Sequence, residues 1–212
     1  MWTAIAVAQA ILVATQIVLL LRDRSDQDSL VTIMKSQVVL RFEHQGTEGY
    51  YEKRQEVVAN CDGVTGMTET ALRPEYGEFQ LLRVTPASNW KSHTIRPQDP
   101  PLDIRFNIPP KRGEHFERVI SGVFKNSFPG STEWFDISVT RIIEEISIKV
   151  IAPSDRRFVA IGVEQLDTLR GARSDLPEDS YSVVHEGRMY SSVMLRLTRP
   201  RIGFRYRIHW TW

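Results

Sequence analysis

The chain has 212 residues, and its 27 basic and 26 acidic side chains leave a formal net charge of +1 at pH 7. Dedicated nucleic-acid binders usually carry a marked basic excess, so no nucleic acid is expected as a partner. The 12 glycines and 11 prolines are scattered singly, which is typical of frequent turns and not of low-complexity sequence.

The first predicted element is a membrane-spanning helix at the N-terminus. Residues 2–21 carry no formal charge, and as a helix they would be roughly 30 Å long, about the thickness of the hydrocarbon core. A cleaved signal peptide is one alternative, but it needs a basic segment before the apolar run and small residues at the cleavage site. A buried soluble helix or a coiled coil is the other, although the run leaves no charged face for solvent. We predict an anchor and its basic exit over 1–24, then a juxtamembrane linker over 25–36.

The predicted anchor also carries a surface for contact with another helix. Gln9 and Gln16 are seven residues apart and share a helix face, while Ala6, Ala10 and Ala14 form an adjacent face of small residues. Small residues let helix backbones approach closely, and glutamine amides can hydrogen-bond across a helix pair. The pattern favours self-association or contact with a partner helix; the alternative is that these residues stand there by chance.

Charges beside the anchor predict its orientation. Arg22 and Arg24 follow the apolar run, and no Lys or Arg precedes it, so the positive-inside tendency places the C-terminal domain in the cytoplasm. Cys61 is the single cysteine and cannot form an intramolecular disulfide, which agrees with that compartment. The predicted localisation is therefore the inner or plasma membrane, with one span and a cytoplasmic C-terminal domain.

Residues 37–212 are predicted to form one all-β domain. Short segments with alternating or β-branched apolar residues follow one another, separated by Gly and Pro. These segments are 38–43, 50–59, 79–84, 102–108, 115–124, 134–139, 142–151, 158–163, 189–197 and 204–212. The last two are predicted to form a hairpin. Between strands, 61–76 is predicted as a loop with a helical turn near 68–72, and 165–180 as a surface loop.

The number and spacing of the strands predict an antiparallel β-sandwich of Ig-like architecture, or a partly closed barrel. Alternation of apolar and polar side chains is typical of antiparallel sheets with one wet face. No long segment with helical period lies between the strands, which argues against a βαβ architecture. The Cys–Trp–Cys signature of immunoglobulin domains is missing from the sequence, so only the architecture would be shared.

The sequence offers no catalytic or metal-binding motif. Its five histidines form no i, i+4 pair and no compact cluster with Cys61, so no metal site is expected. The segment around Cys61 resembles a turn, and we interpret its thiol as unreactive. Neither a G-x-S-x-G elbow nor a glycine-rich phosphate loop is present. No catalytic residue and no cofactor is predicted.

Basic residues near the C-terminus are the candidate binding residues of the domain. They are Arg199, Arg201, Arg205, Arg207 and His209. Guanidinium groups suit anionic lipid headgroups or an acidic or phosphorylated ligand. We favour the alternative, a solvated sheet face whose arginines pair with acidic residues on neighbouring strands. The aromatic residues that alternate with them from Phe204 to Trp212 are predicted to lie in the core.

Taken together, the sequence predicts a membrane-anchored interaction or sensor module, not an enzyme. It would bind a partner protein or a ligand at the membrane, or associate with a second copy of itself. Two alternatives remain open. The first is a hydrolytic or other enzyme whose site is built from the loops 61–76 and 165–180. The second is a β-barrel that binds a small hydrophobe, which would require a sizeable apolar cavity.

Overall fold

The computed structural model describes residues 30–69, 72, 74–87 and 93–212. The predicted anchor, with Gln9, Gln16 and the alanine face, therefore lies outside the described residues. Within the described ranges, no helix is long and apolar enough to cross a membrane. Strands make up most of this part of the chain, which confirms the predicted all-β class.

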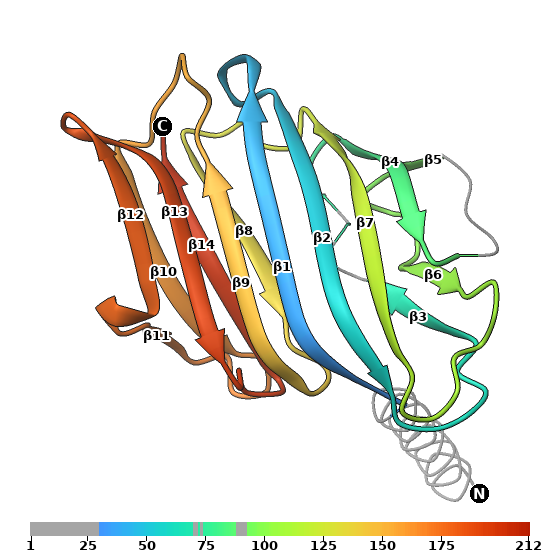
Figure 1. Ribbon diagram of the computed structural model, residues 1–212. Helices are drawn as coiled ribbons and strands as arrows, with labels where there is room; N and C mark the ends of the chain where they lie inside the picture. The colour runs from blue at the N-terminus through green and yellow to red at the C-terminus, as the bar shows by residue number, and fades with distance from the viewer. Residues whose placement is uncertain (1–29, 70–71, 73, 88–92) are drawn as a thin grey trace, which may run out of the picture.

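The larger sheet has eight strands in the order β12-β13-β9-β1-β2-β7-β4-β5 (Figure 1). Its strands are β1 (Val31–Glu43), β2 (Glu48–Ala59), β4 (Glu78–Thr85), β5 (His93–Ile95), β7 (His115–Lys125), β9 (Ile143–Ile151), β12 (Tyr181–Glu186) and β13 (Met189–Thr198). The short 3-10 helix η1 (His44–Gly46) joins β1 to β2. Strand β1 begins at Val31, within the segment predicted as a linker.

A second sheet has four strands in the order β11-β10-β14-β8, and β3 pairs with β6 in a third sheet of two strands. These strands are β3 (Gly66–Glu69), β6 (Leu102–Arg105), β8 (Thr132–Ser138), β10 (Ala160–Asp167), β11 (Arg173–Asp175) and β14 (Phe204–Thr211). The 3-10 helix η2 (Glu178–Ser180) precedes β12. The result is a sandwich of several sheets, as predicted.

The core lies between the large sheet and the four-stranded sheet. On β1 the alternating residues Val38, Leu40 and Phe42 are all buried, as their period of two predicts. Tyr206, Ile208 and Trp210 are the matching buried set on β14, so the aromatic face of that strand lies in the core as predicted. The Phe42 and Trp210 ring centroids are 5.3 Å apart, which joins the two sheets through aromatic packing.

Two features of the strand pairing differ from the prediction. Strands β13 and β14 do not form a hairpin, because β13 pairs with β9 and β12, whereas β14 pairs with β10 and β8. The segment between them crosses from one sheet to the other, so that each strand buries its apolar face from the opposite side of the core. In addition, β1 pairs with β9 in parallel, so the large sheet is mixed and not purely antiparallel.

The two segments predicted as loops contain short strands. Strand β3 lies within 61–76, where a helical turn was expected. It pairs with β6, so that Gly66 lies opposite Arg105 and Glu69 lies opposite Leu102. The segment predicted at 165–180 contains the end of β10 and the whole of β11. Four-residue and three-residue strands carry too few alternating positions to be recognised by period.

Candidate functional site

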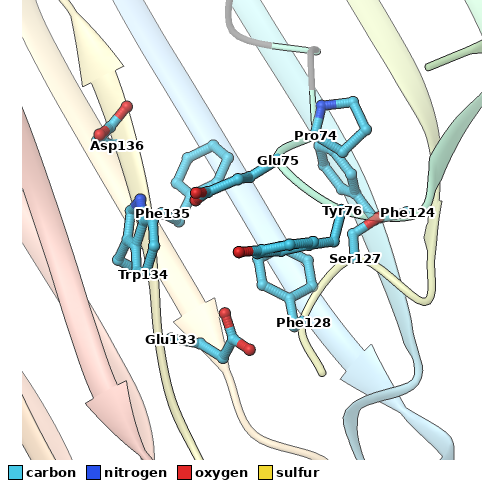
Figure 2. A pocket seen from close by; sticks show the side chains of 10 residues that line it. All are labelled: Pro74, Glu75, Tyr76, Phe124, Ser127, Phe128, Glu133, Trp134, Phe135 and Asp136. Carbon is cyan, nitrogen blue, oxygen red and sulfur yellow. The ribbon is translucent and has the colours of Figure 1, made fainter. Parts of the chain in front are cut away.

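A pocket of about 110 Å³ lies beside β8, the strand at the end of the four-stranded sheet (Figure 2). Three separate segments supply its walls: the chain before β4, the end of β7 with the turn that follows it, and β8 itself. The lining residues are Pro74, Glu75, Tyr76, Phe124, Ser127, Phe128, Glu133, Trp134, Phe135 and Asp136. We refer to it as the β8 pocket.

Aromatic rings form much of the wall of the β8 pocket. Phe124 and Phe135 are buried, whereas Tyr76 and Trp134 keep 54% and 36% of their surface exposed. Figure 2 shows the Tyr76 hydroxyl and the Glu75 carboxylate pointing toward Trp134 across the pocket. The pocket thus combines a buried apolar wall with partly exposed aromatic rings and one exposed carboxylate, that of Glu75.

All charged residues that line the pocket are acidic: Glu75, Glu133 and Asp136. Glu133 is 6% exposed and accepts a hydrogen bond from the Gly130 backbone N–H at Oε1. Burial raises the pKa of the Glu133 carboxyl, and the nearby Glu75 carboxylate raises it further, while the Gly130 N–H acts in the opposite direction. A cation bound between Glu75 and Glu133 would relieve the repulsion between them.

Strand alternation places the carboxylates on two sides of β8. Glu133 and Phe135 point inward and are buried, whereas Trp134 and Asp136 lie on the other face. The residues that line the pocket therefore come from both faces of β8. Strand β8 pairs with β14 only in the part of the chain that the structure describes, so it ends the sheet there.

Two of the sequence-predicted arginines lie next to this pocket, but they are already paired. Arg207 Nη2 donates to Asp136 Oδ2 at 2.9 Å, and Arg207 Nη1 lies 3.7 Å from Glu164 Oε1. Arg205 Nη1 is 3.6 Å from the same Asp136 oxygen. The Arg207 guanidinium also lies 5.1 Å from the centroid of the Trp134 ring. These arginines therefore support the pocket wall through Asp136 and Trp134.

The other predicted binding residues do not gather at one place with them. Arg199 directly follows β13, and its Nε donates to Glu144 Oε2 at 3.0 Å. Arg201 stacks over Phe204, with 5.6 Å between guanidinium carbon and ring centroid. His209 is exposed on β14, and its imidazole lies over Gly162. Arg199, Arg205 and Arg207 thus lie beside acidic side chains, whereas the contacts given for Arg201 and His209 are with Phe204 and Gly162.

Sequence reasoning missed the residues that build the β8 pocket. Glu75 and Tyr76 come from the segment predicted as a loop, and Glu133 directly precedes the predicted strand at 134–139. One signal was available: Trp134 alternates with buried Phe135 and so falls on the solvent face, where a large aromatic side chain is unusual. No pattern in the sequence links that residue to Tyr76, since the two meet only through the fold.

The chemistry of the β8 pocket suits an organic cation. Ammonium and guanidinium groups bind to the faces of Trp and Tyr rings, and carboxylates add charge-assisted hydrogen bonds. Among the described residues, no group of three or more His, Cys, Asp or Glu side chains is placed to hold a metal ion. The arrangement can therefore bind and orient a basic group.

Comparison with protein-family models and with curated proteins found no match. Among solved structures, the chain is similar to a "putative protease" from Parabacteroides distasonis ATCC 8503, with 10% identity, a TM-score of 0.49, and coverage of 87% of this chain and 41% of that one. It is also similar to an M1 zinc metallopeptidase from Deinococcus radiodurans, with 7% identity, a TM-score of 0.43, and coverage of 84% and 42%. The chain thus spans about two fifths of each structure, and similarity this low transfers no activity.

Proposed function

We propose that the protein is a membrane-anchored interaction module whose β-sandwich binds a basic side chain of a partner protein in the β8 pocket. The observation that carries the proposal is the combination of exposed Tyr76 and Trp134 rings with the Glu75 and Glu133 carboxylates at the end strand of a sheet. The anchor over 1–24 would hold this pocket at the cytoplasmic surface of the membrane and raise its local concentration for a partner there.

The partner would approach as an extended segment. A cation–π contact contributes about 0.5–2 kcal/mol, and a hydrogen bond to a charged group contributes about 1.5–3 kcal/mol. Together these correspond to a dissociation constant on the order of millimolar or weaker for an isolated amine. A segment that also adds main-chain hydrogen bonds along the open side of β8 would bind more tightly, which is how β-strand addition gains affinity.

The interior of the sandwich supports binding at its surface and not inside a barrel. Large side chains fill the core, among them fully buried Phe42, Phe158 and Trp210. The Phe158 and Trp210 ring centroids are 5.6 Å apart. A ligand-binding barrel would instead need an apolar space of a few hundred Å³ in its interior, whereas the pocket of about 420 Å³ lies where Val39, Tyr50 and Leu82 of the large sheet are exposed.

A peptide selection on the full-length protein in detergent tests the proposal. A random library of extended heptapeptides should be enriched for Lys or Arg at one fixed position, because one basic side chain enters the pocket. The double substitution Glu75→Gln and Glu133→Gln should abolish that enrichment, whereas Glu178→Gln in the exposed helix η2 should leave it unchanged. Enrichment without a basic residue, or with the same basic residue in the double variant, would contradict the proposal.

A further inference from the structure

Strand β2 carries polar side chains into the interior of the sandwich. Tyr51, Lys53, Gln55 and Val57 occupy alternate positions on its inward face, and all four are buried. An inward face is normally apolar throughout, because burying a charged group costs free energy unless it is paired. Lys53 is only 7% exposed and Gln55 only 2%. Lys53 and Gln55 do not line the β8 pocket.

Residues from three further strands complete a buried polar cluster. Lys53 Nζ donates to Glu69 Oε2 on β3 at 2.7 Å, and Arg118 Nη2 on β7 donates to the same oxygen at 3.0 Å. Arg118 Nε donates to Gln55 Oε1 at 2.8 Å, and Gln55 Nε2 donates to Ser36 Oγ on β1 at 3.1 Å. Gln55 thereby presents its acceptor to Arg118 and its donor to Ser36.

Among the described residues, Lys53 and Arg118 together carry more positive charge than Glu69 balances. Lys53 and Arg118 are both buried and share one carboxylate, Glu69. Arg141 is also close enough to lower the pKa of Lys53 and Arg118, although burial is the largest cause for each. Within the described residues, Arg118 Nη1 is buried and has no hydrogen-bond partner. An unpaired buried donor of this kind is unfavourable, and more so when it belongs to a charged group.

A cavity of about 40 Å³ adjoins these groups. The polar residues that line it are Ser36, Lys53, Gln55, Thr68, Glu69, Arg118, Ser138, Thr140 and Arg141. Most of them bring N–H or O–H donors, and Arg141 lies half-buried in the segment between β8 and β9. One water occupies about 30 Å³ of liquid volume, so the cavity has room for a group of roughly that size.

We propose that this cavity binds a small monovalent anion, with chloride as the simplest case. Arg118, Lys53 and the half-buried Arg141 would surround the anion, and the neighbouring hydroxyls would donate to it. The anion would give Arg118 Nη1 a partner and reduce the excess positive charge of the cluster. The small volume of the cavity, about 40 Å³, favours a small anion such as chloride.

Thermal unfolding of the full-length protein in detergent tests this site. Sodium chloride should raise the Tm by about 3–6 °C at a tenfold excess over Kd, and the Tm should continue to rise with the logarithm of the chloride concentration. Sodium gluconate at equal ionic strength should not, because gluconate is too large for the cavity. Arg141→Gln should reduce the chloride-specific rise in Tm, while Arg112→Gln at an exposed position should retain it. Arg141 is chosen because a substitution of fully buried Arg118 risks loss of folding.

Broadening of the 35Cl NMR signal gives a direct second measurement. Wild-type protein should broaden the signal, bromide should compete, and Arg141→Gln should broaden it less. Equal effects of chloride and gluconate on the Tm would overturn the proposal, as would unchanged broadening in Arg141→Gln. Neither result depends on binding at the β8 pocket, so failure here leaves the proposed function standing.

Discussion

Lys53 shows how a single side chain can make a folded state depend on pH. Its ammonium group is buried against Glu69, which Arg118 also contacts. Burial lowers the pKa of Lys53 below its ordinary value of 10.5, and the attraction of Glu69 opposes that effect only in part. Because Arg118 also neutralises Glu69, removing the charge of Lys53 does not leave a buried carboxylate alone.

We therefore predict that Lys53→Met flattens the pH dependence of stability below pH 10. Between the folded-state pKa and 10.5, the unfolded chain binds more protons at Lys53 than the folded chain does, so the free energy of unfolding rises with pH. This contribution is complete above 10.5 and is lost as pH falls through the folded-state pKa. Burial raises the pKa of Tyr51 above 10.0, so its contribution to stability falls as the unfolded tyrosine ionises near pH 10, and this contribution is present in both wild type and Lys53→Met.

Urea unfolding from pH 7 to 10 in chloride-free buffer measures this difference. The wild-type free energy of unfolding should increase more steeply with pH than that of Lys53→Met. Lys111→Met, at an exposed position, serves as the matched control and should keep the wild-type slope. If the free energy of unfolding changed with pH in parallel for wild type and Lys53→Met, Lys53 would have the same pKa in the folded and unfolded states, which contradicts the prediction.

At the scale of the elements, the contact between β4 and β7 depends on a glycine. A Cβ atom at Gly122 of β7 would lie well inside van der Waals contact with the Phe79 ring and the Gln80 carbonyl oxygen. The register of this pair also shifts between Leu81 and Arg83, as at a β-bulge. The two strands therefore approach closely where the side chain is missing.

Gly122→Ala should destabilise the protein by about 1–3 kcal/mol, because the added methyl group meets backbone and a buried ring that cannot both move away. The free energy of unfolding in urea is the measurement. Ser121→Ala, one residue earlier on the same strand and only half-buried, should change it by less than about 0.5 kcal/mol. A wild-type value for Gly122→Ala would mean that β4 can shift to accept the methyl group.

The elements also show what the sequence can predict. Strands β1 and β14 were predicted because each alternates over many positions, and β9 because it is rich in Ile. The pairing of β13 with β14 was wrong, because strand period does not tell which sheet a strand joins. The β8 pocket was missed for a similar reason: Tyr76 and Trp134 are far apart in sequence and become neighbours only in the fold.

At the scale of the whole molecule, the sandwich begins close to the proposed anchor. Strand β1 starts at Val31, seven residues after Arg24. At a maximum of about 3.3–3.6 Å per residue, that segment spans at most roughly 25 Å. The domain would therefore lie near the membrane surface, where an extended segment of a membrane-bound partner can reach β8. This arrangement requires residues 2–21 to span the bilayer.

The full-length chain should accordingly sediment with bacterial membranes and resist extraction by alkaline carbonate. Ile11→Arg should weaken this association, because an arginine at the centre of a span costs about 2.5–3.5 kcal/mol of insertion free energy. Thr3→Arg should weaken it less, since a side chain near the end of a span can reach the interface. The sandwich core is assembled from described residues between Val31 and Trp210, so the released variant should keep the wild-type unfolding transition. Complete release of the wild-type chain by carbonate would refute the span and, with it, the placement of the β8 pocket at the membrane.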